Sequence, residues 1–127
     1  MNDQQYTQHC RQVLNDYCAQ LAQRTQALPE GDHLRELAHD FVRLASDAGD
    51  LHGDGPALVM RLFTHYPDFV PDFPRELLWF MGGECLHFMP DEEIAVYQSL
   101  DEMRAEAAIR GELIDFQSAR AKLLKSQ

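Results

Sequence analysis

The pattern Glu-x-x-His occurs twice in this sequence, as Glu36 with His39 and as Glu84 with His87. Residues three positions apart on an α-helix project from the same face, so each pair presents a carboxylate beside an imidazole. Carboxylate oxygens and imidazole nitrogens are common metal ligands in proteins. The two pairs therefore predict one candidate site for a divalent metal, formed by four side chains from two helices.

Helical di-iron proteins use two such pairs together with single Glu residues from two further helices. The other helices expected in this part of the chain, over residues 3–28 and 56–66, contain no Glu. Glu36 and His39 also lie on a polar stripe, opposite the apolar side of their helix that carries Phe41. A solvent-exposed helix face explains this pair without a metal. A metal-binding protein or metal-dependent enzyme is the alternative interpretation.

Two further patterns imitate known metal sites over a few residues. His39-Asp40 resembles the His-Asp dyad of HD-type metal phosphohydrolases, and the resemblance covers only these two residues. The segment from Asp50 to Gly55 (DLHGDG) imitates the opening of an EF-hand calcium loop. The twelfth position of that loop, where an EF-hand has a bidentate Glu, is Arg61. A glycine-rich turn between two helices is therefore the expected structure.

The cysteines do not form a recognisable catalytic arrangement. Cys85 and His87 are two residues apart, so on a helix their side chains diverge by about 200° and cannot form a nucleophile–base couple. Cys10 and Cys18 follow an apolar stripe, where free cysteine behaves as a small hydrophobic residue. The sequence contains no phosphate-binding loop, nucleophile elbow or dinucleotide fingerprint. No catalytic activity is evident from these patterns.

Composition and charge narrow the class of protein. A chain of 127 residues with a hydrophobic fraction of 45% suits one soluble globular domain. The formal net charge of -10, from 21 acidic and 11 basic residues, argues against binding to nucleic acid or to an anionic membrane. The first twelve residues contain no basic and no apolar stretch of the kind that a secretory signal has, so we expect none, and Cys10 and Cys18 lie too far apart on one helix for a disulfide. We therefore expect a cytoplasmic protein with reduced thiols.

Apolar residues recur at three- and four-residue steps, which predicts an all-α fold, a compact bundle of five or six helices in one domain over residues 1–127. Proline, glycine and capping residues mark the expected helices, which cover residues 3–28, 33–48, 56–66, 74–89, 90–111 and 112–124. The prolines of residues 66–74 predict an extended connector before a central hydrophobic helix. The sequence leaves open whether the helix that begins at Pro74 is interrupted at Gly82-Gly83, and whether the last two helices are one helix bent at Gly111.

The helix that begins at Pro74 carries the strongest candidate for a partner surface. Arg75 and Glu76 form its polar first turn, and residues 77–81 (LLWFM) are apolar on every side of the helix axis. Either this helix is central in the fold, or one side of it forms an interface, where Trp, Phe and Met are enriched. The predicted partner-binding residues are Trp79, Phe80, Phe69 and Phe73.

The expected function is that of a small acidic cytoplasmic protein that acts through protein–protein contacts. Such a protein would be regulatory, accessory or of the immunity type, and we expect it to self-associate. The expected partner is a second copy of the chain or another protein, and neither nucleic acid nor a membrane. No catalytic residue and no cofactor is predicted, apart from the alternative divalent metal at Glu84, His87, Glu36 and His39.

Overall fold

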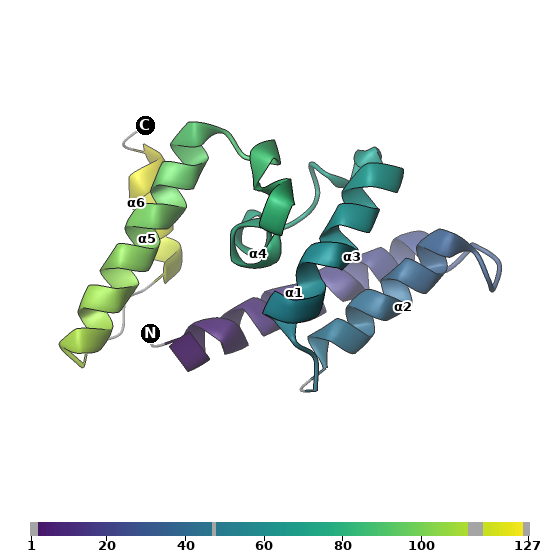
Figure 1. The fold of residues 1–127 in the computed structure, drawn as a ribbon, viewed down its shortest axis with the longest axis horizontal. Helices are drawn as coiled ribbons and strands as arrows, with labels where there is room; N and C mark the ends of the chain where they lie inside the picture. Colours follow the sequence, from purple (N-terminus) through teal and green to yellow (C-terminus); the bar gives the residue numbers. More distant parts are fainter. Residues whose placement is uncertain (1–2, 47, 112–115, 126–127) are drawn as a thin grey trace. The chain divides into compact units, whose positions relative to one another are not determined.

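The computed structural model describes residues 3–46, 48–111 and 116–125, and every regular element in these ranges is a helix (Figure 1). The predicted all-α fold is therefore confirmed for this part of the chain. Its elements are α1 Asp3–Thr25, α2 His33–Ala45, α3 Leu51–His65, the 3-10 helix η1 Pro67–Phe69, α4 Arg75–Met81, the 3-10 helix η2 Gly83–Phe88, α5 Asp91–Ile109 and α6 Phe116–Lys125.

The chain forms two compact units. In the larger unit, His9–Leu86, α2 packs against α3, and α3 packs against both α4 and η1. The smaller unit joins the start of α1 to the chain from His87 onward, and in it α5 packs against α6. Gly111, which follows α5, has a φ of +70°, a left-handed conformation that ends a helix without strain at glycine. The single domain expected from the sequence stays a prediction.

An aromatic cluster forms the centre of the larger unit. The ring of Phe73, a residue that is 1% exposed, lies 5.1 Å from the ring of Tyr17 and 5.4 Å from that of Phe63. The ring of Phe41 lies 6.4 Å from the same Phe73 ring. Edge-to-face and tilted ring pairs at these separations are favourable in addition to the burial of their area. The cluster therefore joins α1, α2, α3 and the segment before α4.

Both ends of α2 are capped by hydrogen bonds. The carboxylate of Asp32 accepts a hydrogen bond of 2.9 Å from a backbone amide of the first turn, which confirms the predicted cap. At the other end, the guanidinium of Arg11 donates to the carbonyl oxygens of Leu44, Ser46 and Gly49. The last carbonyls of a helix lack partners within it, so Arg11 both satisfies them and ties α1 to α2.

The helix α3 begins at Leu51 rather than at Pro56, so it includes the segment that imitates an EF-hand loop. The carboxylate of Asp50 caps it by accepting a hydrogen bond of 3.0 Å from the Gly53 amide. Leu51 is 2% exposed and anchors the first turn in the core. The predicted glycine-rich turn is wrong because this cap and this buried leucine start the helix earlier. Helical backbone does not form the loop that a calcium site of this type needs.

The connector between α3 and α4 is more compact than the extended segment predicted from its prolines. Pro67–Phe69 form η1, and Val70 continues with right-handed helical angles. Proline at the first position of a helical turn is already restricted to a suitable φ, so it favours such turns as well as extended chain. At the far end, α4 ends at Met81, and Gly83, with a φ of +56°, begins η2, so the helix is interrupted at the glycine pair.

Candidate functional site

The four predicted metal ligands lie on two helical segments. Glu36 and His39 are exposed on α2, and Glu84 and His87 are exposed residues of η2. Among the residues that the structure describes, no group of three or more His, Cys, Asp or Glu side chains is placed to hold a metal ion. The metal site therefore stays a prediction from the sequence.

Asp40, the second residue of the His-Asp dyad, links two helices through ion pairs. Its carboxylate accepts hydrogen bonds from Arg43, one turn further along α2, and from Arg61 of α3. The Arg61 nitrogen lies 3.2 Å from the carboxylate oxygen. Arg61, which occupies the twelfth position of the EF-hand imitation, thus has an intramolecular partner.

The three cysteines are free and buried, which matches the role of small hydrophobic residues predicted for Cys10 and Cys18. Burial raises the pKa of the Cys18 thiol from its ordinary value of 9.0 to about 11. Burial, followed by the neighbouring Glu84 carboxylate, also raises the pKa of Cys85. Since the thiolate is the reactive form, a raised pKa makes these side chains poor nucleophiles near neutral pH.

At pH 8, the thiols of the native protein should therefore react with Ellman's reagent at least about tenfold more slowly than those of the protein in denaturant. The raised pKa of Cys18 also predicts that stability falls as pH rises from about 9 towards 11, because only the unfolded state ionises in that interval. Stopped-flow absorbance with and without guanidinium chloride measures the two reaction rates. Urea unfolding at pH 8 and pH 10 measures the change in stability. Equal reaction rates in the two states would contradict the buried placement.

The predicted partner-binding residues differ in their accessibility. Phe73 belongs to the buried aromatic cluster, so we assign it to the core instead of to a partner surface. Phe69 is half-buried beneath Arg24, whose guanidinium carbon lies 4.0 Å from the centre of the ring. Trp79 and Phe80 are half-buried on α4 and stay predicted contact residues.

A groove of about 560 Å³ lies between the last turns of α1 and the middle of α2. Its lining combines apolar and basic side chains, which include Ala22, Ala38 and Val42, and Arg35, His39 and Arg43. Val42 is 52% exposed, a large fraction for an apolar side chain. None of the described residues that line this groove is acidic. Contiguous apolar surface rimmed by polar residues marks interaction sites, and Val42 and Ala22 are the exposed apolar residues of this groove.

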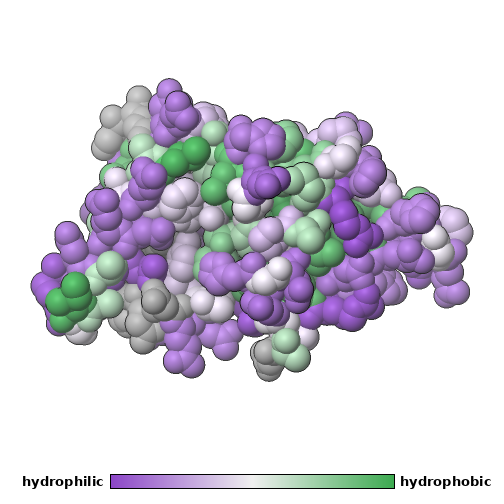
Figure 2. All heavy atoms as spheres, in the orientation of Figure 1, coloured by the Kyte–Doolittle hydropathy of each residue, from purple (hydrophilic) through white to green (hydrophobic). Residues whose placement is uncertain are grey.

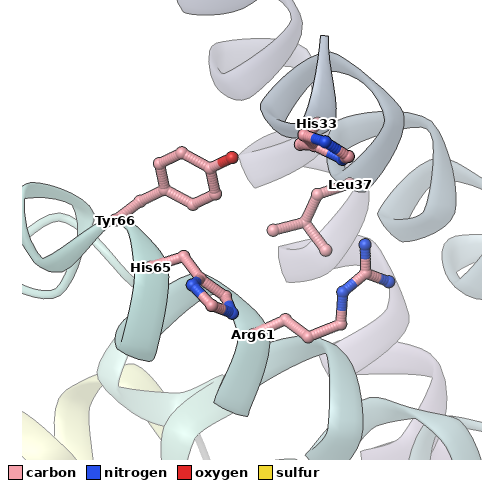
Figure 3. Close-up of a pocket in the computed structure, with 5 residues that line it drawn as sticks. All are labelled: His33, Leu37, Arg61, His65 and Tyr66. Carbon is pink, nitrogen blue, oxygen red and sulfur yellow. The ribbon is translucent and has the colours of Figure 1, made fainter. Parts of the chain in front are cut away.

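A second cavity, of about 520 Å³, lies between α2 and α3 (Figure 3). His33 and Leu37 reach it from α2, and Arg61 and His65 reach it from α3. Tyr66, the residue that caps α3, completes the lining. Figure 3 shows the ends of the polar side chains arranged around the side chain of Leu37, which is 1% exposed. The cavity thus has a buried apolar floor and a polar rim.

The sequence patterns did not identify this cavity. Arg61 and His65 are four residues apart and therefore share one face of a helix, which is the available local signal. His33 lies far from them in the chain and approaches them only because α2 packs against α3. The packing of α2 against α3 depends on where the connection between them ends. The sequence pattern placed the start of α3 too late, at Pro56, whereas α3 starts at Leu51.

Hydrophilic residues cover much of the face shown in Figure 2, and the net charge of the chain is -10. The exposed acidic residues of α5 include Asp91, Glu92, Glu102 and Glu106. In the described part of the chain, none of the helices combines the length and the apolar character of a membrane span.

Comparison with known families gives a match to the PA2817-like family over residues 2–127, nearly the full length of the chain. No curated protein and no solved structure matches the chain. The groove between α1 and α2 and the cavity between α2 and α3 both lie within the matched residues.

Proposed function

The chain belongs to the PA2817-like family, and we propose that it acts through protein–protein contacts, as a self-associating regulatory, accessory or immunity-type protein of the cytoplasm. The groove between α1 and α2 carries this proposal, because it exposes 52% of Val42 in a concave surface. Removing such a side chain from water upon binding is favourable. Free, buried cysteines suit a reducing compartment, which supports the cytoplasmic assignment.

The proposed occupant of the groove is a second copy of the chain, through its α5 helix. The groove presents Arg35 and Arg43 beside its apolar part. α5 exposes the acidic residues of the opposite sign, Asp91, Glu92, Glu102 and Glu106. Complementary charges accelerate encounter and fix the orientation of two partners. A basic groove and an acidic helix on the same chain therefore favour contact between copies.

We expect the protein to sediment as a dimer at micromolar concentration, and Val42→Glu to raise the dissociation constant at least about tenfold. The substitution replaces an apolar contact with a carboxylate that must lose its hydration and that repels the acidic α5 of the other copy. Sedimentation velocity over a range of protein concentrations measures this change. Added sodium chloride should also weaken the wild-type dimer, because salt screens its charge pairs.

Met60→Glu is the matched control for this experiment. Met60 is 36% exposed on α3 and does not line the groove, so the new charge there should leave the dimer unchanged. A wild-type protein that is monomeric at micromolar concentration would overturn self-association. A dimer that survives Val42→Glu but dissociates in Trp79→Ala would place the contact on α4, as the sequence pattern predicted.

A further inference from the structure

We infer that the cavity between α2 and α3 binds a small organic phosphate, held by Arg61, His33, His65 and Tyr66. This site shares none of its lining residues with the groove proposed for self-association, so it adds a ligand to the proposed function and does not depend on it. The inference rests on the hydrogen-bonding chemistry of the lining, its charge and the size of the cavity.

The polar groups of the cavity are mainly hydrogen-bond donors. The guanidinium of Arg61 carries five N–H groups and accepts nothing, and each imidazole and the phenol offer a further donor. None of the described residues that line the cavity is acidic, although the chain has 21 acidic and 11 basic residues. A ligand that fills this cavity must therefore supply acceptor atoms and is favoured by negative charge.

Asp40 positions the principal cation of the cavity. Its carboxylate oxygen lies 3.2 Å from one terminal nitrogen of Arg61, which restricts the guanidinium, and the guanidinium carries further N–H groups besides the one that donates to Asp40. Asp40 also pairs with Arg43, so one carboxylate is shared by two guanidinium groups and the three side chains together keep a positive charge. A guanidinium fixed in this way forms two parallel hydrogen bonds with an oxyanion at little entropic cost.

A phosphate monoester fits this lining better than a carboxylate does. It carries close to two negative charges at neutral pH and three acceptor oxygens, enough for a guanidinium and two imidazoles. The volume of about 520 Å³ is within the range of small-molecule sites, roughly 300–1,000 Å³, and exceeds the size of a bare phosphate. The ring of the half-buried Tyr66 supplies apolar surface for the organic part of such a ligand.

Arg61 and His65 also lie in the last turns of α3, where positive side chains complement the helix dipole. That structural role would explain two of the four polar residues, but it requires neither His33 nor a cavity beside them. It also predicts no saturable binding, so a titration separates the two explanations.

The test is an amide NMR titration of the full chain at constant ionic strength, with phenyl phosphate, inorganic phosphate and benzoate as probes. We expect phenyl phosphate to produce saturable shifts in α2 and α3, at a lower concentration than either other probe. Arg61→Gln should raise its dissociation constant at least about tenfold, because it removes a charge-assisted hydrogen bond. His65→Gln should raise it about threefold or more for the same reason.

Arg110→Gln is the control, because it removes the same charge from the exposed residue at the end of α5, which does not line the cavity and does not contact Asp40. It should leave the dissociation constant of phenyl phosphate within about twofold of the wild type. Equal losses in Arg61→Gln and Arg110→Gln, or no saturable shift at about 10 mM phenyl phosphate, would overturn the site. Equal affinity for inorganic phosphate and phenyl phosphate would show that the cavity does not bind the organic part of the ligand. Circular dichroism checks that each variant is folded. If Arg61→Gln does not fold, the dissociation constant of His65→Gln tests the site in its place.

Discussion

Replacing Phe73 with alanine is expected to lower the free energy of unfolding by about 3–5 kcal/mol, the range for removing a buried aromatic side chain. The ring is enclosed by Tyr17, Phe41 and Phe63, so its loss leaves a cavity among rings from three helices. Those helices are fixed by their other contacts and cannot close the space completely. Urea unfolding followed by circular dichroism, at one fixed protein concentration, measures the change.

Phe69→Ala is the matched control, because Phe69 lies four residues earlier in the same connector. It is half-buried beneath Arg24, so its removal should cost about 1–2 kcal/mol through a cation–π contact and partial burial. Equal losses in the two variants would show that Phe73 is not the centre of the core. If Phe73→Ala leaves stability unchanged but weakens the dimer, Phe73 belongs to the partner surface that the sequence predicted.

The parts of the fold that the sequence predicted well depend on local signals. Asp32 caps α2 as expected, since a carboxylate one residue before a helix accepts its free amides wherever the helix later packs. Pro90 precedes α5, and the acidic residues that follow it suit the positive end of the helix dipole. Such signals act within one turn and need no information about the rest of the molecule.

The errors occurred where tertiary packing decides between local alternatives. Proline is most favourable in the first turn of a helix, but the Asp50 cap and the burial of Leu51 start α3 earlier and place Pro56 inside it. Phe69 and Phe73 have the same side chain in the same proline-rich segment, yet one is half-buried and the other is in the core. Periodicity does not separate them, because the segment is a short 3-10 turn at Pro67–Phe69 followed by irregular chain, not one continuous helix or strand.

The candidate ligand site was less predictable than the fold. The cavity combines residues of α2 and α3 that are more than twenty positions apart in the chain. Arg61 was noted in the sequence only because it stands where an EF-hand calcium loop has a glutamate. In contrast, the repeated Glu-x-x-His pattern was conspicuous, but spacing alone does not determine whether two such pairs meet. Non-local donor clusters become visible only when the helix packing is known.

Glu76 illustrates the same limit and leads to the second large expected effect. The sequence placed this residue in a polar first turn, but in the structure Glu76 is 5% exposed, and its carboxylate lies 2.8 Å from Nε2 of His9. This contact joins α1 to α4. Glu76→Ala should lower the free energy of unfolding by about 2–3 kcal/mol, because it removes a charge-assisted hydrogen bond and leaves the imidazole without this partner.

Three comparisons attribute that loss to the pair of Glu76 and His9. Glu36→Ala also removes an acid from the first turn of a helix, but Glu36 is exposed, so its loss should cost at most about 0.5 kcal/mol of helix-dipole stabilisation. Glu76→Gln keeps the shape and an acceptor oxygen and should cost about 1 kcal/mol, less than alanine. A double-mutant cycle with His9→Ala should give a coupling energy of about 1–2 kcal/mol. Independent, additive effects of the two substitutions would show that the 2.8 Å contact does not hold α4 against α1.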